Sequence, residues 1–327
     1  MSLANKYRPK KWEDVVGQDI IVEILKKQIE RQEIKNCYLF CGERGVSKTT
    51  CARILANEIN NNEGEPIELD CASNNGVDNI RQIITEAQQM SIDSKYKVFI
   101  LDECGFLTSA AWSAALKLIE EPPKNTIFIF CTTDPQRIPM TILSRVQRFD
   151  FKLITREDIA NRLEYICKQE QIQKYEKDAL LMIADKGRGS MRDAITLLEE
   201  SISYSRDITV ENIIKVFGIV KEDSLYKLTQ AIIEKNEKLK FEICDQLKNQ
   251  ETNHIKIIDE WIKFLVECAK VIKTKNKKLG KVKEEYKDYF ITREYDIVGL
   301  IDRILKLRYI AKDFKNDDLL DLIVLSV

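Results

Sequence analysis

Two hydrophobic patterns divide this chain of 327 residues. The first 150 residues contain short, nearly continuous apolar runs, each followed by polar or turn residues, as is typical of parallel strands covered on both faces. These runs are 37–41, 97–101 and 126–131, with a weaker one at 67–70. Helical periodicity alternates with them, at 20–33, 49–60, 77–89 and 110–121. We therefore predict a doubly wound α/β domain with a parallel sheet, whose ligands bind at the carboxyl ends of the strands.

From about Arg156 onward, apolar residues recur at helical spacing, as in Ile159, Leu163 and Ile166. Proline supports this division, because all six prolines lie at or before Pro139. The pattern predicts a mixed domain over 1–151 and helical segments over 152–218 and 219–327. It excludes an all-β protein, a collagen-like chain and a uniform repeat array.

Charge and cysteine content narrow the possible functions. The 52 basic and 53 acidic residues give a net charge of −1, so any nucleic-acid contact must use a local patch.

No apolar run reaches the roughly 20 residues that a membrane helix needs, and the N-terminus has no secretory signal. The nine cysteines form no C-x-x-C pair and His254 is the single histidine, so we expect buried thiols in a reducing cytoplasm and no zinc.

The first apolar run leads into GERGVSKTT at 42–50 and then into a helical pattern. This is close to the phosphate-binding motif G-x-x-x-x-G-K-[ST], in which loop N–H groups cradle phosphates, the lysine contacts the β- and γ-phosphates and the hydroxyl binds Mg²⁺. The predicted nucleotide-binding residues here are Gly42, Gly45, Val46, Ser47, Lys48, Thr49 and Thr50. Ser47 replaces the second motif glycine. The alternative is a strand-to-helix turn with a surface lysine.

The next strong apolar run ends in Asp102-Glu103. One carboxylate there can hold Mg²⁺ together with Thr49, and the second can orient a water, as in phosphoryl-transfer sites. We assign Asp102 to the metal and Glu103 to the water. Thr132 and Thr133 end the following run and can sense the γ-phosphate, although a plain turn before Pro135 would also explain them.

Two arginines complete the predicted site. Arg145 follows the last apolar run, and Arg192 follows Ser190, a predicted N-cap with Asp193 three residues on. Arginine stabilises the charge of a transferring phosphoryl group, within one chain or from a neighbouring subunit. Each could instead be a surface arginine in a salt bridge.

Nine ordered motifs resemble the clamp-loader ATPases of the AAA+ class, and within them the gamma/tau family of bacterial DNA polymerase III. The motifs occupy 7–9, 15–18, 42–50, 72–78, 101–103, 118–123, 132–135, 142–145 and 189–193. Beyond 219 the resemblance is limited to helical character and position. It implies an AAA+ domain over 1–151, a helical lid over 152–218 and a helical collar for oligomerisation over 219–327.

The resemblance also implies roles for individual residues. An adenine pocket would contain Tyr7, Arg8, Val16 and Gln18. Thr132 or Thr133 would be the first sensor, Arg192 the second sensor in the same chain, and Arg145 the finger that contacts the ATP of a neighbouring subunit. DNA-backbone contacts would involve Ser73, Asn74, Asn75 and Arg81.

The implied function is that of a motor subunit that binds and hydrolyses ATP with Mg²⁺ to load a sliding clamp on primer–template DNA. Its partners would be the clamp and other clamp-loader subunits, in an assembly of five. The alternatives are a structural subunit that binds nucleotide poorly but supplies Arg145, and another AAA+ DNA motor such as a branch-migration helicase.

The sequence departs from the family at four places. Ser47 replaces a glycine, Cys104-Gly105 follows the acidic pair where a small residue and histidine are usual, and Val146 follows Ser144-Arg145 in place of cysteine. The short stretch 57–66 has no zinc module. We therefore expect a short form, of cellular or phage type, without zinc and without the long tau tail.

Overall fold

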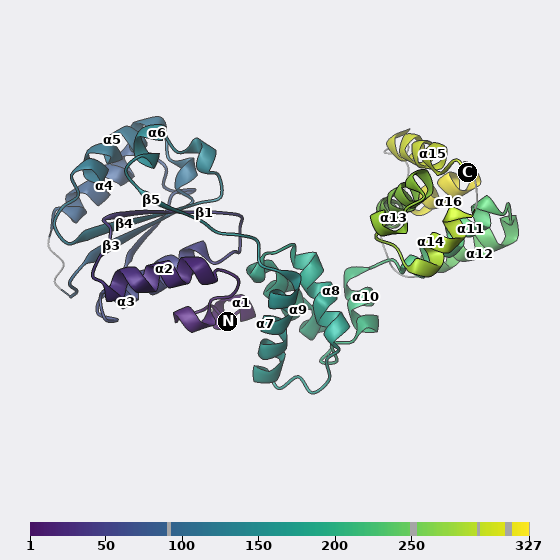
Figure 1. Ribbon diagram of the computed structural model, residues 1–327, viewed down its shortest axis with the longest axis horizontal. Coiled ribbons are helices and arrows are strands. Elements are labelled where there is room, and N and C mark those ends of the chain that lie inside the picture. Colours follow the sequence, from purple (N-terminus) through teal and green to yellow (C-terminus); the bar gives the residue numbers. More distant parts are fainter. Residues whose placement is uncertain (90–92, 249–253, 293–294, 311–315, 327) are drawn as a thin grey trace. The chain divides into compact units, whose positions relative to one another are not determined.

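The computed structural model describes residues 1–89, 93–248, 254–292, 295–310 and 316–326 (Figure 1). The chain divides into two compact units, Met1–Thr209 and Val210–Val327. This division falls close to the second predicted boundary at 218, and the three-part domain organisation stays a prediction. Among the described residues, no helix is both long and apolar enough to cross a membrane.

A five-stranded sheet forms the centre of the first unit, and all of its strand pairs are parallel. In spatial order the strands are β2 (Ile67–Asp70), β3 (Lys97–Asp102), β4 (Thr126–Thr132), β1 (Cys37–Cys41) and β5 (Gln147–Asp150). The predicted α/β class with a parallel sheet is confirmed. The edge strand β5 was not predicted, because only Phe149 of its four residues is buried.

Helices cover both faces of the sheet (Figure 1). Alternate strand residues such as Phe40 and Ile129 pack against α2 (Asp19–Glu30) and α3 (Lys48–Ile59). The intervening residues, such as Leu39 and Phe128, pack against α4 (Val77–Ala87) and α5 (Ser109–Glu120). Burial on both faces explains why these strands read as continuous apolar runs. All nine cysteines are buried and free, as predicted, and burial raises the pKa of thiols such as Cys131.

Short helical turns occupy the connections of this unit. They are α1 (Leu3–Lys6), η1 (Trp12–Asp14), η2 (Cys104–Phe106), η3 (Pro135–Arg137) and α6 (Met140–Leu143). Three longer helices follow the sheet: α7 (Arg156–Gln169), α8 (Lys177–Gly187) and α9 (Met191–Tyr204). Ser190 is the N-cap of α9, and its hydroxyl accepts a hydrogen bond from Asp193 N, so the predicted cap is confirmed. The sheet and α7 to α9 all lie within the first compact unit, Met1–Thr209.

The second unit is helical in its described residues. Its elements are α10 (Val210–Phe217), α11 (Glu222–Ile233), α12 (Glu237–Lys248), α13 (His254–Thr274), η4 (Lys277–Leu279), α14 (Glu284–Ile291), α15 (Ile297–Ile310) and α16 (Asn316–Ser326). The core surrounds α13, whose Trp261 is fully buried. The lysine-rich segment 273–283 is mainly surface, and Lys277 and Lys283 form ion pairs with Asp288 and Asp223.

One buried polar pair in this core gives a test of the fold. The Trp261 indole N–H donates to Thr229 Oγ1 at 2.9 Å, and both residues are fully buried. Thr229→Val keeps the shape but removes the acceptor, so we expect the free energy of unfolding to fall by about 1–3 kcal/mol in urea titrations. Thr229→Ser keeps the hydroxyl and should lose less. An equal loss in both variants would contradict a role for this hydrogen bond.

Candidate nucleotide-binding site

A cavity of about 780 Å³ lies at the carboxyl ends of the strands. Its walls come from the N-terminal segment, the loop after β1, the ends of β2 and β3, the residue after β4, and the first turns of α9. The predicted site residues on these walls are Tyr7, Arg8, Val16, Gly45, Ser47, Lys48, Thr49, Thr50, Asp102, Glu103, Thr133 and Arg192. The fold therefore brings together twelve residues that the sequence spreads over nearly two hundred positions.

The loop from β1 to α3 has the curvature that phosphate binding requires. Gly45 and Ser47 both have left-handed backbone angles, with φ of 77° and 78°. Lys48 is the first residue of α3, and its Nζ donates to the carbonyls of Gly42 at 2.7 Å and Glu43 at 2.8 Å. Because Lys48 is only 6% exposed, burial lowers the pKa of its ammonium group, and the nearby Glu103 opposes this shift. The lysine thus lies within the curve of the loop.

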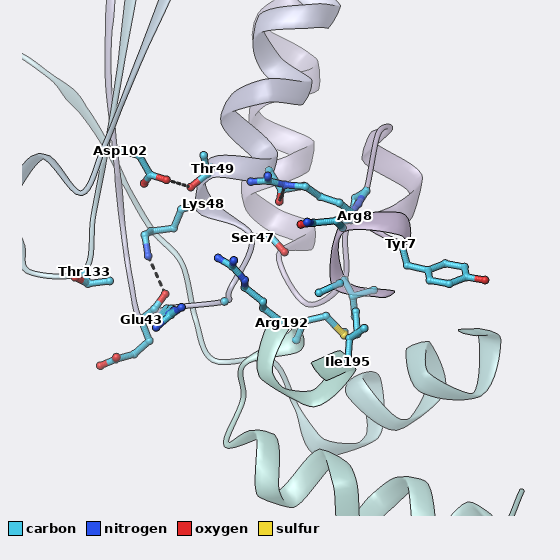
Figure 2. Close-up of a pocket in the computed structure, with 18 of the residues that line it drawn as sticks. Tyr7, Arg8, Glu43, Ser47, Lys48, Thr49, Asp102, Thr133, Arg192 and Ile195 are labelled. Atoms are coloured by element: carbon cyan, nitrogen blue, oxygen red, sulfur yellow. Dashed lines mark hydrogen bonds between the residues drawn. The ribbon is translucent and has the colours of Figure 1, made fainter. Parts of the chain in front are cut away.

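The end of β3 places two carboxylates, Asp102 and Glu103, on the cavity wall. Thr49 Oγ1 donates to Asp102 Oδ2 at 2.8 Å, so the two predicted Mg²⁺ ligands are adjacent (Figure 2). Among the described residues, no group of three or more His, Cys, Asp or Glu side chains is arranged to hold a metal. One hydroxyl and one carboxylate nevertheless fit Mg²⁺, which takes few protein ligands and completes its shell with phosphate oxygens and water.

Glu103 has a different partner from Asp102. Thr133 donates to Glu103 Oε2 from its hydroxyl at 3.0 Å and from its backbone N–H at 3.4 Å. Thr132, in contrast, is buried and its Oγ1 accepts a hydrogen bond from Asp134 N at 3.0 Å. Of the two threonines that the sequence offered as a sensor, Thr133 is therefore the one that faces the cavity.

Helix α9 supplies the opposite wall. Met191 N donates to Gly45 O at 3.1 Å, so the start of α9 is bonded directly to the loop. A Cβ on Gly45 would lie 2.0 Å from Ser190 Oγ, which explains glycine there in addition to its positive φ. Figure 2 shows Arg192 projecting from the first turn of α9 toward the loop. Arg192 and Lys48 therefore present positive charge to the same cavity.

The N-terminal segment closes one end of the cavity. Arg8 Nε donates to Thr50 Oγ1 at 3.1 Å, and burial, with a smaller effect from Arg53, lowers the pKa of Arg8. The Tyr7 hydroxyl donates to Glu170, whereas the Tyr7 carbonyl accepts from Arg162 at 3.3 Å. The segment is thereby fastened to α7, beside the loop.

Sequence reasoning missed several residues of the cavity wall. Met191 and Ile195 add apolar surface beside Arg192, while Asp14, Asp70, Phe106 and Arg162 add charged and aromatic groups. Ile195 lies three residues after Arg192 on α9, so helical spacing from Arg192 was the signal that could have identified it. Met191 is adjacent to Arg192 in sequence, and helical spacing gives no such signal for it. The acidic and aromatic residues carry no motif of their own.

Five residues predicted for the nucleotide site lie outside the cavity wall: Gln18, Gly42, Val46, Thr132 and Arg145. Val46, in the loop, and Gln18, which precedes α2, are both buried. Arg145 pairs with Glu120 at 2.8 Å and donates to Thr141 O at 2.7 Å on the surface. Within this chain it does not contact the cavity.

The predicted DNA-contacting residues lie around the start of α4. Ser73 Oγ and Asn74 Nδ2 donate to Asp70 at 2.8 and 3.0 Å. The N-cap of α4 is Gly76, which provides no side-chain cap. Arg81 is exposed and pairs with Asp78 at 3.0 Å. The turn thus presents polar groups and the start of a helix to solvent.

The fold resembles that of solved AAA+ motors. The Thermotoga maritima RuvB Holliday junction branch migration motor matches 69% of this chain and 79% of its own chain, with a TM-score of 0.56 and 19% identity. The family of DNA polymerase III clamp loader subunit ATPase lid domains matches residues 158–207. With the parallel sheet and the loop that carries Lys48, these matches define an AAA+ P-loop ATPase fold.

Sequence relatives identify the family. The DNA polymerase III subunit gamma of Buchnera aphidicola subsp. Schizaphis graminum is 30% identical over 90% of both chains. The subunit tau of Bacillus subtilis is 38% identical over 80% of this chain and 50% of its own, and the DNA polymerase III delta subunit family matches residues 68–155. The chain belongs to the DNA polymerase III gamma/tau subunit family. It spans about half the length of the gamma/tau relatives from Bacillus subtilis and Mycoplasma genitalium.

The left-handed backbone at Ser47 gives a test of the loop. A residue with a Cβ is strained there, so Ser47→Gly should raise the free energy of unfolding by about 1 kcal/mol in urea titrations. Ser47→Ala keeps the Cβ and serves as the matched control, with no such gain. If alanine stabilised the protein as much as glycine, loss of the hydroxyl, and not relief of backbone strain, would be the cause.

Proposed function

We propose that this chain is an ATP-dependent clamp-loader motor subunit. It binds and hydrolyses ATP to load a sliding clamp on primer–template DNA during replication in the cytoplasm. The observation that carries this proposal is the convergence of Lys48, Asp102, Glu103 and Arg192 on one cavity in a chain of the gamma/tau family. Other clamp-loader subunits and the clamp are its proposed partners, in an assembly of five.

The arrangement of side chains supports binding of the triphosphate along the loop. The loop N–H groups and the Lys48 ammonium would bind phosphate oxygens, and Arg192 would approach the terminal phosphate from α9. Thr49 and Asp102 would hold Mg²⁺, which neutralises charge on the phosphates when bound. Tyr7, Arg8 and Val16 line the end of the cavity that we assign to the adenine.

Glu103 is the residue that we assign to positioning the attacking water. Its carboxylate is held by both the hydroxyl and the N–H of Thr133. The Thr133 hydroxyl carries one proton, so it can donate either to Glu103 or to a phosphate oxygen. A change of acceptor from Glu103 to the terminal phosphate would connect the bound nucleotide to the orientation of this carboxylate. Catalysis would then consist of positioning and charge stabilisation, with little covalent chemistry.

A structural subunit is the second candidate, and one observation favours it. Ser47 places a Cβ, at a left-handed backbone angle, where the motif has glycine, and this Cβ would crowd the approach of a phosphate. Against it, the other predicted groups on the cavity wall are in place. The RuvB likeness concerns the fold alone, so another AAA+ DNA motor has less support than a clamp loader.

DNA contact is proposed at the turn before α4. Ser73, Asn74, Asn75 and Arg81 lie at or near the surface around the start of this helix, where N–H groups favour phosphate. The chain as a whole is nearly neutral, so this local contact should be weak and sensitive to salt.

Lys48 gives the first test of nucleotide binding. Lys48→Ala removes a buried ammonium from the loop, and it should abolish ATP binding at concentrations that saturate the parent, as measured by titration calorimetry. Lys27→Ala, which removes an exposed lysine of α2, is the control and should bind ATP like the parent. Parental ATP affinity in Lys48→Ala would contradict the site.

Arg145 gives a test of action between subunits. Arg145 lies outside the cavity of its own chain, so Arg145→Ala should leave ATP binding by that chain unchanged. In the assembled complex the variant should reduce DNA-stimulated ATP turnover by about a thousandfold, because the neighbouring subunit's ATP loses the arginine that stabilises its transition state. Arg148→Ala removes another exposed arginine and should have no such effect. If the Arg145 variant turned over ATP at the parental rate in the complex, its assignment would be wrong.

A further inference from the structure

Residues 151–154, here called the strap, connect β5 to α7. Phe151 N donates to Cys41 O at 2.7 Å, at the end of β1, and Ile154 N donates to Gly189 O at 3.1 Å, just before α9. One end of the strap is therefore bonded to the strand that enters the nucleotide-binding loop. The other end is bonded to the turn that leads to Arg192.

The side chain of Gln18 bonds to the middle of the strap. Its Nε2 donates to Lys152 O at 2.7 Å, and its Oε1 accepts from Lys152 N at 3.2 Å. The same Nε2 also makes a longer hydrogen bond, 3.4 Å, to Val46 O in the loop. Gln18 is only 4% exposed, and Val46 is fully buried. One buried amide thus joins the loop to the strap.

Glycines enclose the strap so closely that it has little room to shift. A Cβ on Gly17 would lie 3.1 Å from Ile154, and one on Gly42 would lie 2.7 Å from Phe151 O. A Cβ on Gly189 would lie 2.8 Å from Leu153 Cβ. Close packing of this kind transmits displacement, because neither side can move without the other.

We propose that Gln18 is a positioning residue that couples the nucleotide-binding loop to α9 and so places Arg192 at the terminal phosphate. This inference rests on the proposed nucleotide-binding function and differs from a contact between Gln18 and adenine. The loop reaches α9 directly through Gly45 and Met191, and a second time through Gln18 and the strap. Two attachments fix both the distance and the orientation of the helix, whereas one would leave it free to pivot.

The ratio of ATP to ADP affinity is the quantity that this coupling controls, because Arg192 would contact only the phosphate that ATP has in addition. Gln18→Met keeps the length of the side chain and removes its hydrogen bonds. Loss of these bonds should lower the ratio by about three- to tenfold, toward the value of Arg192→Ala. In an Arg192→Ala background, Gln18→Met should lower the ratio no further.

The matched control, Gln28, lies on α2, the helix whose N-cap is Gln18. Gln28 also forms a side-chain amide hydrogen bond, to Gln147 Oε1 at 2.9 Å in β5, but it does not contact the strap. Gln28→Met should therefore retain the parental ratio. Gln18→Glu, which keeps the acceptor for Lys152 N but loses both donors, provides a second variant should Gln18→Met not fold. It should also lower the ratio.

The test is to titrate ATP and ADP separately and to compare the ratio of the two affinities. The proteins are the parent, Gln18→Met, Gln18→Glu, Gln28→Met, Arg192→Ala and the double variant Gln18→Met/Arg192→Ala. Two results would overturn the role of Gln18 without affecting the proposed nucleotide-binding function. One is a parental ratio in a folded Gln18 variant. The other is that Gln18→Met lowers the ratio in the Arg192→Ala background by as much as it does in the parent. A parent that binds neither nucleotide would contradict the proposed function and this role together. A decrease that depends on Arg192 is the result that the coupling predicts.

Discussion

The tight loop between β1 and α3 is the constraint on which the rest of the site depends. It must connect a buried strand to a helix within a few residues and direct its N–H groups toward a ligand. Two residues with left-handed backbone angles, Gly45 and Ser47, make this sharp turn. Because the loop is this compact, the start of α9 packs directly on Gly45. The position of Arg192 therefore follows from the path of the loop.

The parallel sheet sets the second half of the site. In its register Cys41 lies beside Thr132, and Asp70 lies beside Asp102. Strands that end at the same edge place the residues that follow them within hydrogen-bonding reach, which accounts for the pairs Thr49–Asp102 and Thr133–Glu103. The chemistry at this edge thus depends on strand order and register.

The sequence was sufficient for features that local chemistry determines. Apolar runs predicted four of the five strands, and the motifs at 42–50 and 101–103 predicted the polar cavity residues Ser47, Lys48, Thr49, Thr50, Asp102 and Glu103. It was insufficient where contacts join distant segments. Strand β5 is an edge strand with polar residues, and Gln18 bonds to carbonyls 28 and 134 positions away, which no local pattern records. Thr132 and Thr133 could be separated only by the direction in which each side chain points.

Ser47 is where the sequence and the proposed function conflict most. Its left-handed backbone keeps the loop in the glycine-type conformation at some cost in stability, so the conformation needed for phosphate binding is present in the protein. The most direct measurement of the central claim is ATP turnover of the parent and of Ser47→Gly, with and without a sliding clamp and primed DNA. The account predicts that the parent binds ATP and that clamp and DNA together accelerate hydrolysis, with Ser47→Gly at least as active. Absence of detectable ATP binding by the parent would contradict it and would favour a structural subunit.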